Sequence, residues 1–317
     1  MTLAGPVLES ACMFVEEYLE ELRRERFAPV AIAAYLRRVA ARTREQIWKN
    51  PAAVRSIWSV GLGFFAAAFV AAGAMALVYD RHLAYDFFLQ TSLWMLPTFA
   101  FVTASVGLLR DREGFALPGL NLPLTLTLLR VCLVPGIALF LLDRHFTLAL
   151  GTFLVAALTD VADGWLARRW KQETLLGIVL DPLVDIVFNL AMFFALAAAE
   201  LLPNWVFWVA ALRYGTLLVG GACLYLFVGP LRIRPTLFGR LTGIVMSALV
   251  ALLTLLHAVR GPLRETLMPL TQIALGVLIS ATVLQVVVMG WYNLRLMTGE
   301  QATSQGRVVG DVRWGRE

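Results

Sequence analysis

Eight stretches of this 317-residue chain are apolar over a length that can cross a bilayer. A spanning helix needs about 20 predominantly apolar residues, and its backbone groups must bond to one another inside the hydrocarbon layer. The stretches lie near residues 57–79, 88–109, 122–142, 147–166, 175–201, 205–229, 238–258 and 267–293. Hydrophobic residues make up 59% of the chain and charged residues only 15%, which excludes an ordinary soluble domain. We therefore expect an all-α polytopic membrane protein.

Four aspartates lie inside two of these apolar stretches. Asp160 and Asp163 are three residues apart and Asp181 and Asp185 are four apart, so each pair shares a helix face. The polar residues 168–173 separate the two stretches. If the stretches are antiparallel helices, Asp163 lies opposite Asp181, about 14 Å from the turn. Asp160 then lies opposite Asp185, one helical turn deeper. The sequence therefore predicts four facing carboxylates in one leaflet.

Carboxylates in this setting need a cationic partner, because each ionised one costs roughly 2.5–3.5 kcal/mol at the centre of a spanning helix. Clustered carboxylate oxygens suit hard cations such as Mg²⁺, Mn²⁺ or Ca²⁺. Two such ions can clamp a pyrophosphate and stabilise both the attacking and the leaving oxygen of a displacement at phosphorus. One carboxylate can remain available to accept a proton from an incoming hydroxyl.

The residues between the aspartates are small or basic. Gly164 and Gly177 expose backbone where a ligand or the facing helix must come close. Ala167 adds only a small side chain to the same face, and the planar guanidinium of Arg168 has paired donors suited to phosphate. With the aspartates they form the pattern Asp160-x2-Asp163-Gly164-x2-Ala167-Arg168-x8-Gly177-x3-Asp181-x3-Asp185. This pattern resembles, at all eight positions, the signature of CDP-alcohol phosphotransferases.

The resemblance implies an enzyme in which a small alcohol attacks a CDP-linked lipid, usually CDP-diacylglycerol, and releases CMP. It implies a two-metal site for Mg²⁺ or Mn²⁺, held by Asp160, Asp163, Asp181 and Asp185. The fourth aspartate, Asp185, would bind metal or act as the general base. The CDP pocket would be lined by Asp163, Gly164, Ala167, Arg168 and Gly177. Family members often follow the fourth aspartate with lysine, where this chain has Ile186, which weakens any transfer of acceptor specificity.

Residues 121–135 resemble the start of the first core helix in phosphatidylglycerophosphate synthases and their close relatives. Asn121 can cap this helix, with Pro123 in the first turn. By the same resemblance, Asn121 and Thr127 join the expected CDP site. Arg130 falls about two turns inside the helix and needs an acidic or phosphate partner. It could bind the acceptor, or it could form an ion pair with a neighbouring helix.

Two further arginines are candidates for acceptor binding. Arg240 stands near the position where cardiolipin-type and phosphatidylglycerophosphate-type members carry a lysine, so it could anchor the phosphate of an acidic acceptor. It could equally be a positive flank of a spanning helix. Arg213, in the middle of its span, could reach the active cavity or neutralise a buried acid. Glycerol-3-phosphate is therefore the first expectation for the acceptor, with serine, inositol phosphate and phosphatidylglycerol as alternatives.

We expect the chain to have four parts. Residues 1–55 would form cytosolic amphipathic helices that lie on anionic headgroups, pack on the core or make a homodimer contact. Residues 56–110 would form an additional transmembrane hairpin, and residues 118–296 the six-span core of the family. Residues 297–317 are polar and are expected to be disordered. Lys and Arg placement puts the turn of the aspartate hairpin on the cytosolic side of a bacterial-type inner or plasma membrane.

Other classes of function fit the sequence less well. A cation- or proton-coupled transporter also carries acids in its spans, but they would follow a path through both leaflets. A non-catalytic scaffold would tolerate loss of a motif aspartate, and none is lost. The pI of about 9.4 is explained by basic residues near acidic lipid, and no nucleic-acid module is found. The expected partners are therefore CDP-diacylglycerol, an alcohol acceptor and the lipid bilayer.

Overall fold

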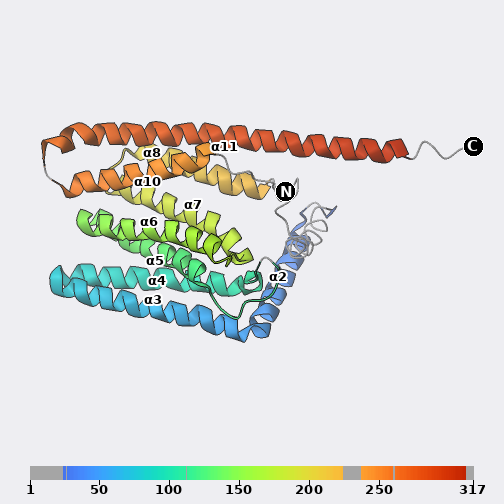
Figure 1. The fold of residues 1–317 in the computed structure, drawn as a ribbon, viewed down its shortest axis with the longest axis horizontal. Helices are drawn as coiled ribbons and strands as arrows, with labels where there is room; N and C mark the ends of the chain where they lie inside the picture. The colour runs from blue at the N-terminus through green and yellow to red at the C-terminus, as the bar shows by residue number, and fades with distance from the viewer. Residues whose placement is uncertain (1–23, 26, 112, 224–236, 260, 312–317) are drawn as a thin grey trace, which may run out of the picture. The chain divides into compact units, whose positions relative to one another are not determined.

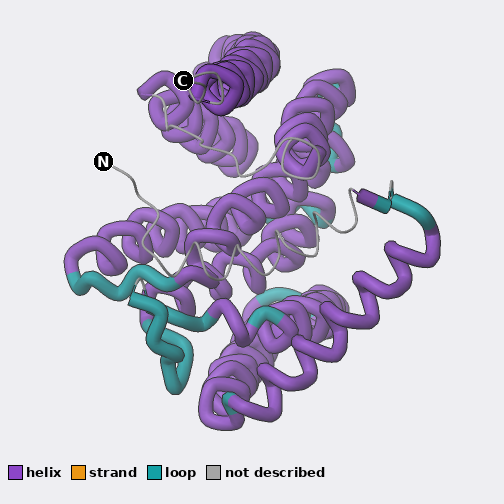
Figure 2. The backbone as a smooth tube through the Cα atoms, turned by 90° about the vertical axis from the view of Figure 1, so that its right-hand side faces the viewer, coloured by secondary structure: helices purple, strands orange, loops and turns teal. Residues whose placement is uncertain are grey.

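The computed structural model describes residues 24–25, 27–111, 113–223, 237–259 and 261–311. Within these ranges, eight helices are long and apolar enough to cross a membrane, which confirms the all-α polytopic fold. Figure 2 shows the described backbone as helices joined by loops. The chain divides into two compact units, residues 1–201 with 254–260 and residues 202–253 with 261–317.

The first unit contains most of the described spans. Its elements are α2 (Pro29–Lys49), α3 (Pro51–Val78), α4 (Arg81–Ala104), the short 3-10 helix η1 (Val106–Leu108), α5 (Leu122–Leu142), α6 (Phe146–Arg169) and α7 (Leu175–Ala198). Helices α3 and α4 form a hairpin that packs on α5, and α5 also packs on α6 and α7 (Figure 1). In the most apolar part of α5, 67% of the residues are buried, against 17–28% in the other four spans of this unit. Helix α5 is therefore the centre of the unit.

The ends of α5, α6 and α7 are formed by local hydrogen bonds. The Asn121 side chain accepts from the Leu124 amide at 3.2 Å, so the predicted cap of α5 is confirmed. Helix α6 ends in a Schellman-type turn, because Lys171 has a positive φ of 53° and the Gln172 amide donates to the Ala167 carbonyl. This turn reverses the chain toward α7, as the hairpin geometry required.

The second unit contains α8 (Asn204–Gly215), the π-helical turn η2 (Thr216–Gly220), most of α10 (Leu237–Ala258) and α11 (Pro262–Asp311). Helix α8 packs against α11 within this unit. The Cβ that an alanine would add at Gly276 would lie 2.5 Å from the Trp205 ring, so the glycine permits this close approach.

The expectations for the two ends of the chain have different outcomes. Within residues 1–55, where amphipathic helices are expected, the structure describes the helix α2, whereas residues 1–23 and 312–317 lie outside the described residues. Residues 297–311, which the sequence predicts to be disordered, are helical, because α11 continues to Asp311. Extending an existing helix needs no new nucleus, and residues 297–311 contain no proline to end it. A polar composition alone did not reveal this.

Candidate active site

Helices α5, α6 and α7 bring together an inner pair of carboxylates, Asp163 and Asp181. The Thr127 hydroxyl of α5 lies 3.0 Å from Asp163 Oδ2 and 3.4 Å from Asp181 Oδ1. The same hydroxyl lies 3.2 Å from the Pro123 carbonyl oxygen. It has one proton for three acceptors, so it can donate to only one of them at a time. The pairing of Asp163 with Asp181 is the one that the spacing predicted.

The outer pair, Asp160 and Asp185, meets a different partner. Arg130 of α5 contacts Asp160 Oδ1 with Nη1, and the same nitrogen lies 3.1 Å from Asp185 Oδ1. The Arg130 side chain is only 5% exposed, whereas the side chains of Asp160 and Asp185 are 51% and 56% exposed. The ion pair with neighbouring helices, one of the two partners considered for Arg130, is therefore present, and its acids are those of the motif.

The four carboxylates thus form two tiers instead of one cluster. Among the described residues, no three His, Cys, Asp or Glu side chains are close enough together to hold a metal ion as they stand. Reasoning from the hairpin α6–α7 alone missed that α5 supplies a bridging residue to each tier. The signal was in the sequence. Thr127 and Arg130 are three residues apart, as are Asp160 and Asp163, so on each helix the two polar residues lie about one turn apart on the same face.

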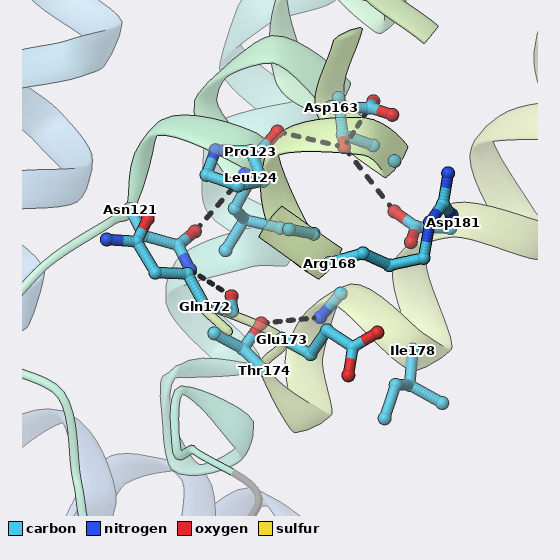
Figure 3. A pocket seen from close by; sticks show the side chains of 14 residues that line it. Asn121, Pro123, Leu124, Asp163, Arg168, Gln172, Glu173, Thr174, Ile178 and Asp181 are labelled. Carbon is cyan, nitrogen blue, oxygen red and sulfur yellow. Dashed lines mark hydrogen bonds between the residues drawn. The ribbon is translucent and has the colours of Figure 1, made fainter. Parts of the chain in front are cut away.

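A pocket opens on the inner tier, between the turn after α6 and the first turns of α5 and α7 (Figure 3). All seven residues expected to bind CDP line it: Asn121, Thr127, Asp163, Gly164, Ala167, Arg168 and Gly177. Sequence reasoning missed some of the residues that complete the lining, including Gln172, Glu173 and Thr174. These polar residues sit in the turn, and only the fold of the turn brings them to the pocket.

Hydrogen bonds tie the walls of this pocket together. Asn121 Nδ2 donates to the Gln172 carbonyl at 2.6 Å, which joins the start of α5 to the turn after α6. The Thr174 hydroxyl accepts from the Gly177 amide at 3.0 Å and so caps α7. The pocket therefore lies at the N-termini of two helices, where the helix dipole favours an anion.

The two motif glycines make room at the pocket. A Cβ at Gly164 would lie 3.3 Å from Arg168 Nη1, so the glycine lets the guanidinium lie close over α6. A Cβ at Gly177 would lie 3.1 Å from Thr174 Oγ1, the atom that caps α7. The absence of a side chain at these two positions therefore leaves room for the Arg168 guanidinium and for the Thr174 hydroxyl that caps α7.

The other two candidate arginines lie in the second unit. The Arg213 guanidinium is 4.6 Å from the centre of the Tyr214 ring, and its Nε is buried without a hydrogen-bond partner in the described part of the chain. Arg240 lies in the first turn of α10, and its side chain is outside the described residues. Both remain predictions as acceptor-binding residues.

Comparison with known proteins decides the family. The model of the CDP-alcohol phosphatidyltransferase family matches residues 120–291, which is more than half of the chain. The chain belongs to this family. The CDP-diacylglycerol–glycerol-3-phosphate 3-phosphatidyltransferase of Aquifex aeolicus is 34% identical over 133 residues, which are 40% of this chain and 72% of that protein.

Other similar phosphatidyltransferases match shorter segments. Escherichia coli has a protein with the same name as the Aquifex aeolicus one. It is 51% identical to this chain over 69 residues, which are 20% of this chain and 37% of that protein. The cardiolipin synthase (CMP-forming) of Rattus norvegicus is 39% identical over 84 residues, 26% of this chain. The chain covers only 28% of that synthase. No solved structure matches the chain. The family match begins just before α5, so α2, α3 and α4 lie outside it.

The donor atoms of this phosphatidyltransferase site fit a divalent cation. Asp163 and Asp181 approach one hydroxyl, which is neutral and can donate to only one of them, so Thr127 does not balance the negative charge of the pair. The four aspartates supply only oxygen donors, the type that Mg²⁺ and Mn²⁺ prefer. The residues present are therefore suited to the metals that the family pattern implies.

Proposed function

We propose that this protein transfers a phosphatidyl group from CDP-diacylglycerol to the hydroxyl of a small alcohol, with release of CMP. One observation carries the proposal. The four aspartates of the complete family pattern face one another from α6 and α7, beside a pocket lined by every other residue of that pattern. Family membership and the names of the relatives support the same reaction class.

In this proposal the pocket holds the CDP part of the lipid. The positive ends of the α5 and α7 helix dipoles favour the pyrophosphate, and Arg168 supplies a charged donor to it. Asp160, Asp163, Asp181 and Asp185 would hold two Mg²⁺ or Mn²⁺ ions. These ions would neutralise charge on the pyrophosphate and on the attacking oxygen.

The proton of the acceptor hydroxyl would pass to the Asp185 carboxylate. Asp185 is suited to this role because its side chain is 56% exposed and lies in the outer tier, beside the CDP pocket and not in its lining. The acceptor oxygen forms a bond to the phosphorus that carries the diacylglycerol. The bond from that phosphorus to the bridging oxygen breaks, and CMP leaves with the bridging oxygen.

Glycerol-3-phosphate is the proposed acceptor. Support comes from the names of the Aquifex aeolicus and Escherichia coli relatives and from the resemblance of residues 121–135. A second candidate is phosphatidylglycerol, favoured by the similarity to cardiolipin synthases. The test presents the purified protein and CDP-diacylglycerol with glycerol-3-phosphate, serine, inositol phosphate or phosphatidylglycerol in turn. Glycerol-3-phosphate should give the highest kcat/KM with CMP release. Faster turnover of serine would defeat the phospho-acceptor assignment and leave the CDP-alcohol chemistry standing.

We also propose that the pocket faces the cytosol, as the distribution of Lys and Arg indicates. Lys171 lies in the turn between α6 and α7 and is exposed. A Lys171→Cys variant of a chain without its three natural cysteines should react with a membrane-impermeant maleimide only in inside-out vesicles. Equal labelling of right-side-out vesicles would reverse the proposed orientation.

A further inference from the structure

Arg130 is a buried cation between two carboxylates that belong to the proposed metal site. It lies on α5, the most buried span of its unit, and its side chain is 5% exposed. A single nitrogen, Nη1, contacts one oxygen of Asp160 and one of Asp185. Its Nε is buried and has no hydrogen-bond partner within the described residues. The guanidinium is therefore held mainly by its attraction to the two carboxylates, because its set of hydrogen bonds is incomplete.

This geometry differs from that of a strong structural ion pair. In such a pair, two guanidinium nitrogens usually bind the two oxygens of one carboxylate in parallel. Here one nitrogen is shared by carboxylates from two helices, and one positive charge faces two negative charges. A divalent cation would match the charge of the two carboxylates better. The side chains of both carboxylates are also half exposed, so protein atoms do not enclose them.

We propose that Arg130 and a divalent cation are alternative counter-cations of Asp160 and Asp185, so that Arg130 sets the metal affinity of the outer tier. The inference rests on the proposed two-metal function. Among the contacts that the structure describes, the inner tier has no cation in direct contact: its bridging residue, Thr127, is neutral, and Arg130 acts on Asp163 and Asp181 only at longer range. A cation entering the inner tier displaces only a hydroxyl contact, whereas one entering the outer tier must displace a guanidinium. The two tiers should therefore bind metal with different affinities, the outer one more weakly.

The test is a titration of the full-length purified protein with Mn²⁺ alone, in which the paramagnetic signal of free Mn²⁺ reports binding without turnover. The wild type should show a tighter and a weaker site. Arg130→Gln should tighten the weaker site at least about tenfold, because no guanidinium has to be displaced. Arg168→Gln is the matched control: it removes the same charge near the pocket but not a contact to the outer tier, and should change either affinity less than about threefold.

Thermal unfolding gives a second readout. In excess chelator, Arg130→Gln should melt below the wild type, since the outer carboxylates then lack a counter-cation, and Mn²⁺ should raise its Tm more than that of the wild type. If Arg130→Gln does not fold, Arg130→Lys serves instead. Lysine keeps the charge but has one compact head on a shorter side chain, so this variant should tighten the weaker site severalfold.

The outcomes separate this inference from the function on which it rests. Unchanged or weaker Mn²⁺ binding in Arg130→Gln, or in Arg130→Lys if that variant alone folds, would overturn the competition between Arg130 and metal. An equal Mn²⁺-induced rise in Tm would do the same. In either case the two-metal proposal stands, provided that the wild type binds Mn²⁺. A wild-type protein that binds no Mn²⁺ would contradict both.

Discussion

Helix α5 presents different chemistry to the two pairs of helices that pack on it. Toward α6 and α7 it presents Thr127 and Arg130, which contact the four aspartates. Toward the α3–α4 hairpin it contributes residues such as Leu128 and Val131 to an apolar cluster, which α7 also joins through Leu176, Leu180 and Val184. The two faces are one residue apart in sequence, because consecutive helix positions point about 100° apart. Neighbouring residues of one helix thus face a charged site and an apolar core.

The hairpin side depends on close packing of aromatic rings. Phe99 of α4 is 1% exposed and packs edge-on against Phe64 of α3, with ring centres 6.0 Å apart. A Cβ at Gly136 of α5 would lie 2.7 Å from the Phe87 ring, so this glycine permits α4 to approach. The hairpin lies outside the family match, yet it covers a face of the helix that carries the site. The comparison suggests that substitutions on the two sides of α5 will separate turnover from stability.

The largest effect is expected on the charged side. Asp185→Asn should lower kcat at least about a thousandfold while CDP-diacylglycerol still binds, because the base is lost and the CDP pocket is intact. Asp163→Asn should weaken both turnover and CDP-lipid binding, because Asp163 lines the pocket. Turnover assays and lipid-binding assays on the two variants make the comparison. A near-normal rate for Asp185→Asn would place the base elsewhere.

On the apolar side, Phe99→Ala should affect stability and leave chemistry alone. The loss should be roughly 3 kcal/mol, at the low end for a buried Phe→Ala change, because the side chain remains in hydrocarbon when a membrane protein unfolds. The free energy of unfolding in a denaturing detergent measures this, with kcat determined per folded molecule. Phe101→Ala, at a 47% exposed position of the same helix, is the control and should change little. A stable Phe99→Ala protein with a large loss of kcat would contradict the expectation that this side of α5 affects stability and not turnover.

The smallest effect is expected at Arg240, and it tests whether a residue of the second unit binds the acceptor. Arg240→Ala should raise the apparent KM for glycerol-3-phosphate about tenfold, or roughly 1.4 kcal/mol, because a charge-assisted contact to the acceptor phosphate is lost. The KM for CDP-diacylglycerol should change little. Arg264→Ala, in α11, is the control and should leave both constants unchanged. If Arg240→Ala also has no effect, Arg240 is a flanking charge and the acceptor phosphate binds elsewhere.

Local features could be read from the sequence, whereas contacts between distant segments could not. The bounds of α5 and the pairing of Asp163 with Asp181 follow from apolar runs and helix geometry. The partner of Arg130 stayed open, because it depends on how α5 lies against α6 and α7. The same holds for the Arg110 carbonyl, which accepts from the Leu175 amide at the start of α7. That contact joins residues 65 positions apart, and periodicity does not encode it.

The central claim is that the four aspartates hold divalent cations for phosphatidyl transfer, and chelation tests it most directly. The purified protein is given CDP-diacylglycerol and glycerol-3-phosphate in excess EDTA, and CMP release is measured before and after Mg²⁺ or Mn²⁺ is restored. Turnover should fall to background in EDTA and return with either metal, because the carboxylates alone cannot neutralise the pyrophosphate. Full turnover in excess EDTA would contradict the two-metal assignment.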